Sequence, residues 1–114
     1  MKFKKTVAID FDGVFNDYKG YDPERIGTPR KGIHQFLQTL SKKYTIIIHS
    51  RRDSSQIRQW LRENNLDGYI RAVTEWKPAA VAYIDDRAIR FNGDYEECLE
   101  AFTEKAYWQN GEEK

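Results

Sequence analysis

Short apolar runs, each followed at once by polar residues, constrain the fold of this chain more than any other feature. The clearest are Thr6–Ile9, Tyr44–His49 with its three consecutive isoleucines, and Val81–Ile84, and Tyr69–Val73 is a weaker fourth. Short, nearly continuous apolar runs rich in β-branched residues are typical of strands covered on both faces, as in a parallel sheet. The sequence therefore predicts a small sheet with buried central strands.

Segments with the apolar period of a helix alternate with these runs. In the first, at about 32–43, apolar residues recur at offsets of three and four, namely Ile33, Phe36, Leu37 and Leu40. A second is expected at 53–64, starting from a capping residue at Asp53 or Ser54, and a third at 93–106. The alternation predicts an α/β, Rossmann-like fold with a mainly parallel sheet, right-handed crossovers and helices on both faces.

The chain has room for one domain. Its 114 residues match the common size of a single compact unit, which we place at 1–106, with 107–114 as a flexible C-terminal tail. Residues 14–31 contain two glycines and two prolines among polar and aromatic residues, which predicts a loop that crosses the fold. This loop is too short to be a cap domain, so we expect an open site.

The composition excludes several classes of protein. Nineteen basic and eighteen acidic residues give a formal net charge of +1, so there is no strong nucleic-acid signature and no global attraction to an anionic membrane. There is one cysteine, Cys98, and no apolar run approaches the length of a membrane span or resembles a signal peptide. These features predict a cytoplasmic protein.

Polar residues follow the predicted strands. They are Asp10, Asp12, Ser50, Asp85 and Asp86, with Lys77 on the loop before the last strand. In an open parallel sheet, ligands bind outside the carboxyl ends of the strands, so these side chains converge if the strands are neighbours. Several carboxylates in one pocket repel one another and need a cation, for which Mg²⁺ is the natural choice.

Four motifs in the chain resemble those of the haloacid-dehalogenase (HAD) superfamily, and they occur in the same order. Ile9–Gly13 matches its hydrophobic-D-x-D-G signature, Ile48–Ser50 its strand ending in Ser or Thr, Lys77 its third motif and Tyr83–Asp86 its acidic fourth motif. Val14 stands where the family commonly has Thr, which removes a helper hydroxyl. The chain is most similar to short, capless, phosphatase-like members with a HAD-like fold.

The resemblance implies the roles of these residues. Asp10 would attack phosphorus and form an aspartyl phosphate, and Asp12 would act as general acid and base. Ser50 and Lys77 would hold the phosphoryl oxygens. The Mg²⁺ ligands would be Asp10, Asp12 through its carbonyl, Asp85 and Asp86. The chain would then be a magnesium-dependent phosphomonoesterase.

Further residues near these motifs have weaker claims to a role. Arg51 and Arg87 can bind a substrate anion, and so can Arg52, although surface ion pairing is the more common role of such residues. His49 is expected to pack away from the site, because the two-residue period of a strand turns it away from the side of Ser50.

Two other classes of function stay open. A receiver-like phospho-accepting signalling domain also combines strand-end aspartates, a hydroxyl and a lysine, but it places an adjacent acidic pair first and its lysine last, whereas here Asp10 and Asp12 come first. A catalytically silent binding module with the same fold is the other. For an enzyme, we expect the substrate to be a small phosphorylated metabolite, a nucleotide or an accessible macromolecular phosphate. A homo-oligomer could cover the open site.

Overall fold

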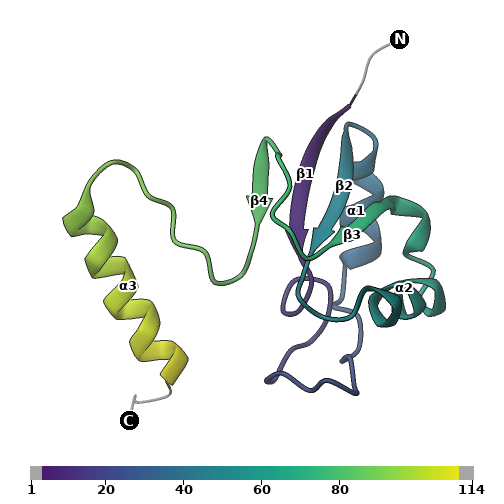
Figure 1. Ribbon diagram of the computed structural model, residues 1–114, viewed down its shortest axis with the longest axis horizontal. Helices are drawn as coiled ribbons and strands as arrows, with labels where there is room; N and C mark the ends of the chain where they lie inside the picture. Colours follow the sequence, from purple (N-terminus) through teal and green to yellow (C-terminus); the bar gives the residue numbers. More distant parts are fainter. Residues whose placement is uncertain (1–3, 111–114) are drawn as a thin grey trace.

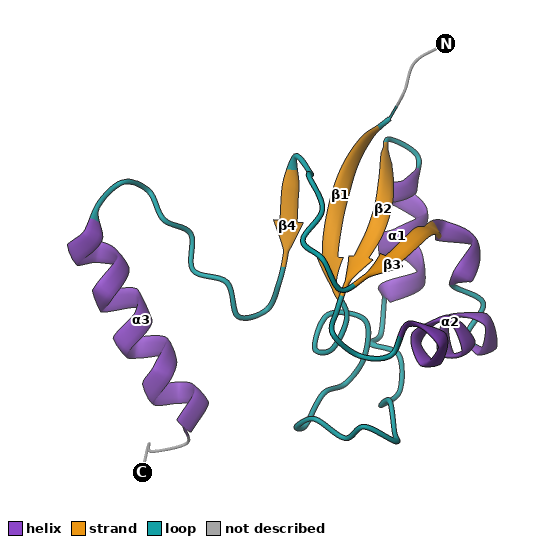
Figure 2. Cartoon of the chain, in the orientation of Figure 1, coloured by secondary structure: helices purple, strands orange, loops and turns teal. Residues whose placement is uncertain are grey.

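The sheet of this protein is parallel throughout. The structure is a computed structural model that describes residues 4–110, with side chains through Glu104. Its strands are β1 (Lys5–Asp10), β2 (Tyr44–His49), β3 (Ile70–Thr74) and β4 (Ala82–Ile84), in the spatial order β3-β2-β1-β4 (Figures 1 and 2). Each neighbouring pair runs parallel. The predicted α/β fold with a parallel sheet is therefore confirmed.

The helices begin close to the predicted positions. They are α1 (Ile33–Ser41), α2 (Ser54–Glu63) and α3 (Tyr95–Asn110), and a short 3-10 helix, η1 (Asp67–Tyr69), precedes β3. The Asp53 carboxylate accepts a hydrogen bond from the backbone N–H of Gln56 at 3.2 Å and so caps α2 as expected. α3 continues to Asn110, so residues 107–110 of the expected tail are helical, and 111–114 lie outside the described residues. No helix in the described part of the chain is long and apolar enough to cross a membrane.

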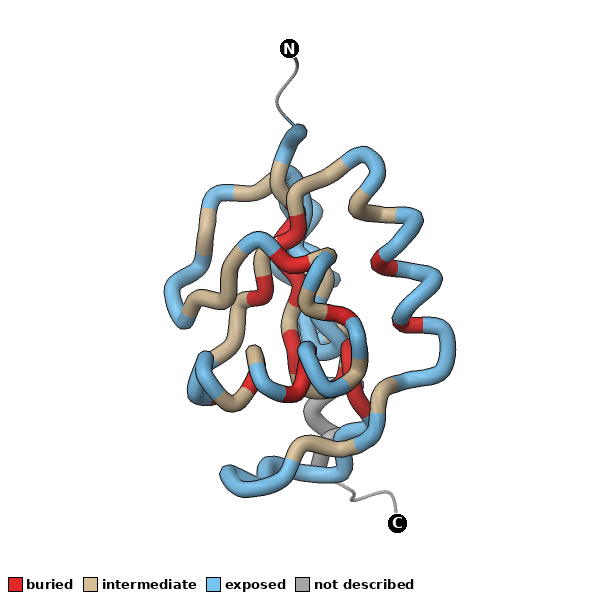
Figure 3. Tube along the Cα trace, turned by 90° about the vertical axis from the view of Figure 1, so that its right-hand side faces the viewer, coloured by how far each residue is buried: buried red, intermediate tan, exposed pale blue. Residues whose placement is uncertain are grey.

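Both α1 and α2 pack against one face of the sheet, which we call the core face. Register places Ile46 beside Val7 and Ile48 beside Ile9, and side chains alternate between faces along a strand, so these residues point to one side. They form the core with the buried apolar residues of the two helices, which are Ile33, Leu37, Ile57, Trp60 and Leu61. Figure 3 shows the buried positions gathered along the centre of the molecule.

The connection from β1 to α1 is a long loop that is anchored in the core. Phe11 and Phe15 are fully buried with ring centroids 5.4 Å apart, and Phe11 meets the ring of Trp60 edge-on at 5.2 Å. Residues 11–32 contain no helix or strand, and their pairing is limited to an isolated antiparallel bridge between Asn16 and Pro29. No cap domain is inserted here, as expected.

The opposite face, which we call the open face, carries no helix in the described part of the chain. Residues 75–81 cross it between β3 and β4, and α3 stands apart from the sheet (Figure 1). The radius of gyration is accordingly 15.6 Å, against about 13 Å for a compact chain of this length. The expectation of helices on both faces is therefore met on one face only, because the 75–81 connection is shorter than the roughly 12 residues of a helical crossover.

Candidate functional site

Strand register brings acidic residues from two distant parts of the chain together. Ile9 of β1 pairs with Ile84 of β4, so Asp10 and Asp85 leave adjacent parallel strands side by side. Ligand oxygens of Asp10, Asp85 and Asp86 lie within 4.8 Å of one another. The expected convergence of these carboxylates at the carboxyl edge of the sheet is present in the structure.

The turn after β1 depends on Gly13. Its φ angle of 93° is a left-handed conformation that residues with a side chain rarely adopt. A Cβ atom at this position would overlap the carboxylate of Asp86. The glycine therefore lets the backbone that follows Asp10 approach Asp86 closely, and this keeps the acidic cluster compact.

The surroundings of Asp10 raise the pKa of its carboxyl group. Burial raises the pKa of Asp10 from 3.8 to about 6, and the neighbouring charges of Asp85 and Asp86 contribute to the increase. The backbone N–H of Phe11 and the guanidinium of Arg87 lower the pKa of Asp10 but do not cancel the rise. Repulsion of this kind between carboxylates is what a bound cation would relieve.

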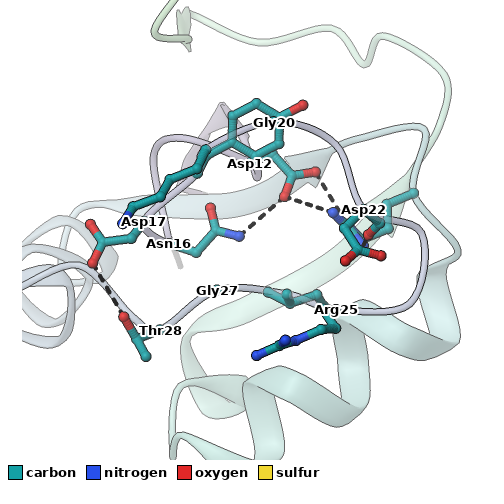
Figure 4. Close-up of a pocket in the computed structure, with 12 residues that line it drawn as sticks. Asp12, Asn16, Asp17, Gly20, Asp22, Arg25, Gly27 and Thr28 are labelled. Atoms are coloured by element: carbon teal, nitrogen blue, oxygen red, sulfur yellow. Dashed lines mark hydrogen bonds and ion pairs between the residues drawn. The ribbon is translucent and has the colours of Figure 1, made fainter.

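The carboxylate of Asp12 has a different set of partners. Arg52 donates to both of its oxygens, from Nε and Nη2 at 3.1 Å each, and Asn16 Nδ2 donates to Oδ1 at 3.1 Å (Figure 4). The ion pair is buried, since the side chains of Arg52 and Asp12 are 2% and 17% exposed. Arg52 is held in turn by the Asp22 carbonyl, which accepts from Nη1 at 2.9 Å, and by the ring of Tyr21. These contacts fix the orientation of Asp12.

Nearly all the residues singled out from the sequence line one cleft of about 480 Å³. They are Asp10, Asp12, Ser50, Arg51, Arg52, Asp85, Asp86 and Arg87. The hydroxyl oxygen of Ser50 accepts a hydrogen bond from the backbone N–H of Arg52 at 3.1 Å, which fixes the turn after β2. The cleft thus places carboxylates, guanidinium groups and a hydroxyl around one hollow, a set of groups that can hold a cation and an oxyanion together.

Lys77 is the exception among the predicted residues. Its side chain does not line this cleft, and its ammonium lies over the ring of Tyr83, 4.5 Å from the ring centroid. The Tyr83 hydroxyl donates to the Pro78 carbonyl at 2.8 Å, so the loop that carries Lys77 is held to β4. The structure does not bring Lys77 to the acidic cluster, and the cations that line the cleft are Arg51, Arg52 and Arg87.

A second hollow, also of about 480 Å³, adjoins the cleft on the side of the 14–31 loop (Figure 4). Asp12, Tyr18 and Arg52 line both hollows. The loop around it is tied together by the Thr28 hydroxyl, which donates to the Asp17 carboxylate at 3.2 Å. The second hollow gives room for the part of a ligand that extends past Asp12.

Sequence reasoning gave no role to two residues that the structure brings to the site. Asn16 is 1% exposed, and its side chain bridges Asp12 and the backbone N–H of Gly13. His49 lines the cleft, whereas it was expected to pack away from it. The register explains the difference, because His49 pairs with Asp10, and paired residues of parallel strands point to the same face.

Comparison with known proteins supports the fold. The chain is similar to the solved structure of a conserved protein from Bacteroides thetaiotaomicron, with 25% identity and a TM-score of 0.61 over 90% of this chain and 93% of that one. No protein-family model matches the chain, and no curated protein matches it. The function therefore has to be inferred from the chemistry of the site.

Proposed function

We propose that this protein is a magnesium-dependent phosphohydrolase that cleaves phosphate monoesters through an aspartyl phosphate on Asp10. The observation that carries the proposal is the acidic cluster, in which ligand oxygens of Asp10, Asp85 and Asp86 lie within 4.8 Å of one another. The resemblance of the strand-end motifs to those of HAD hydrolases supports the same assignment.

The acidic cluster fits Mg²⁺ by the chemistry of its donors. Its side chains offer only carboxylate oxygens, the ligands that small, hard dications prefer, and the cleft leaves room for water and a phosphate group. Asp10, Asp85 and Asp86 would hold the ion, with the backbone carbonyl of Asp12. When bound, Mg²⁺ would offset the negative charge of the carboxylates and of the phosphoryl oxygens.

Asp10 is the nucleophile in this proposal. One of its carboxylate oxygens attacks phosphorus, the bond from phosphorus to the leaving oxygen breaks, and an aspartyl phosphate forms. A pKa of about 6 leaves Asp10 largely ionised at neutral pH and makes it more basic than an ordinary aspartate. Both properties favour attack on phosphorus.

Asp12 transfers the protons in the proposed reaction. It protonates the leaving oxygen in the first step and then takes a proton from the water that attacks the aspartyl phosphate, which releases inorganic phosphate and restores Asp10. Arg52 and Asn16 are positioning residues, because each donates a hydrogen bond to the Asp12 carboxylate. A general base beside the cleft favours turnover over the stable phosphoprotein of a receiver-like domain.

In this proposal, residues after β2 and β4 bind the phosphoryl oxygens. Ser50 offers a hydroxyl, and Arg51 and Arg87 offer guanidinium groups at the cleft. The role that the resemblance implies for Lys77 would require its release from Tyr83. Because the described residues form no cap domain over the cleft, small phosphorylated metabolites, nucleotides and accessible macromolecular phosphates all fit the proposal.

Hydrolysis of an aryl phosphate by the purified protein, with and without Mg²⁺, tests the proposal. We expect Mg²⁺-dependent turnover in the wild type and its loss in Asp10→Asn, which removes the nucleophile at constant volume. Asp94→Asn is the matched control, since Asp94 lies outside the cleft and Asn caps a helix as well as Asp does. Undiminished turnover in Asp10→Asn would exclude Asp10 as the nucleophile.

A further inference from the structure

α3 carries an apolar stripe that stays largely exposed in the described part of the chain. Tyr95, Leu99 and Phe102 are spaced at offsets of four and three, so they lie on one side of the helix, and they are 77%, 63% and 59% exposed. Figure 1 shows α3 well away from the sheet, at the end of an extended linker that starts after β4. An exposed stripe of this kind on a helix marks a surface that another element covers.

The N-terminus of α3 is stabilised by local hydrogen bonds and a ring contact, although its apolar stripe is exposed. Asp94 accepts hydrogen bonds from the backbone N–H groups of Glu96 and Glu97 at 2.9 and 3.2 Å, which caps the helix. The Asn92 side chain donates to Glu97 at 2.7 Å, and the rings of Phe91 and Tyr95 lie 5.1 Å apart. Residues 91–104, which we call the arm, therefore form a locally ordered unit that contributes no residue to the core cluster of the described chain.

The open face of the sheet is uncovered at β4, although Ala8 at its centre is buried. Val81 and Tyr83 point to this face, because Tyr83 pairs with Ala8, on the side opposite to Val7 and Ile9. They are 56% and 45% exposed, and Ile47, which pairs with Ala8 from the other side, is only half-buried. Parallel sheets normally have both faces covered. Within residues 4–110, the 75–81 connection is the one segment that crosses this face.

We propose that the arm of each chain docks on the open face of a second copy, and that the second copy returns the same contact, to give a two-fold symmetric dimer. The extended linker already carries the arm away from its own sheet, which is the conformation that an exchange of identical elements requires (Figure 1). Reciprocal docking covers both stripes and both open faces in one closed assembly.

Charge and area agree with a second copy as the occupant. The described side chains of the arm include four glutamates after the cap and no basic residue, while the open face presents the ammonium of Lys77 above Tyr83. An exposed aromatic side chain offers about 150–250 Å², so the exposed parts of the stripe and of Val81 and Tyr83 amount to roughly 500 Å² for one arm and roughly 1,000 Å² for two. This reaches the minimum of about 1,000 Å² expected of a specific interface.

Sedimentation equilibrium of the full chain tests the proposal. We expect twice the chain mass for the wild type. The double variant Leu99→Glu/Phe102→Glu, which places carboxylates on the stripe, should dimerise at least about 100-fold more weakly. Thr103→Glu is the control for an added carboxylate, because it places one at an exposed position beside the stripe, and it should remain a dimer.

A variant of the sheet side separates loss of the contact from loss of folding. Val81→Glu changes an exposed residue on the open face and should weaken the dimer to a similar extent, with an unchanged thermal unfolding curve at low concentration. A monomeric wild type overturns the proposal, since the arm would then be free or docked on its own sheet. A double variant or a Val81→Glu variant that stays fully dimeric overturns it as well, because the interface would lie elsewhere.

Discussion

Replacement of Arg52 by methionine should destabilise the protein strongly, although Arg52 lies in the loop between β2 and α2. The guanidinium is bound to both oxygens of Asp12 and to the Asp22 carbonyl, and its side chain is 2% exposed. Breaking a buried ion pair by removing one partner costs about 3–5 kcal/mol, and the 17% exposure of Asp12 argues for the lower end, about 3 kcal/mol. For a chain of this size this corresponds to a melting temperature roughly 10 °C lower.

Urea denaturation followed by circular dichroism measures this loss. Arg58→Met is the matched control: Arg58 pairs with Asp67 at 2.7 Å, but the side chains are 29% and 36% exposed, and such a pair contributes at most about 1 kcal/mol. In a double-mutant cycle, Arg52→Met and Asp12→Asn together should cost clearly less than the sum of the single changes, because they share one interaction. If the losses in unfolding free energy were additive, or if Arg52→Met lost no more than Arg58→Met, the stabilising role of the buried ion pair between Arg52 and Asp12 would be refuted.

Three further predictions concern the cleft. Asp12→Asn should reduce turnover far more for alkyl than for aryl phosphates, since a basic alkoxide needs the proton that Asp12 supplies; equal losses would contradict that role. The pKa of Asp10 is about 6 in the folded state, above its unfolded value, so the metal-free protein should lose stability as the pH rises through about 6. For the same reason, Mg²⁺ affinity measured by calorimetry should rise about tenfold from pH 5 to pH 7. An Mg²⁺ affinity that does not change with pH would argue against Asp10 as a ligand. Gly13→Ala should weaken Mg²⁺ binding about tenfold or more, because its Cβ meets Asp86 at a positive φ; unchanged binding would show that Gly13 is not needed for the cluster.

The regular elements of this fold could be predicted from the sequence because local physics decides them. The isoleucine run in Tyr44–His49 is a strand with the predicted limits, and Asp53 caps α2 as its position indicated. The acidic cluster could be predicted as well, since it follows from strand ends in a parallel sheet.

The remaining features depend on contacts that no local pattern contains. Arg51 and Arg52 are alike in sequence, and the inward turn of Arg52 depends on Asp12 and on the Asp22 carbonyl, which lies 30 residues away in the chain. The place of Lys77 depends on the path of the short 75–81 loop across Tyr83. The apolar period of α3 predicts a helix with one apolar side, but it cannot tell which surface that side meets.

The most direct test of the central claim is to look for the phosphorylated aspartate itself. The protein is mixed with an aryl phosphate and Mg²⁺, quenched in acid during turnover, digested and analysed by mass spectrometry. The account predicts one phosphoryl group on the tryptic peptide that spans residues 6–19, at Asp10, and its absence without Mg²⁺ or in Asp10→Asn. A phosphoryl group on another residue, or turnover with no labelled peptide at any quench time, would contradict it.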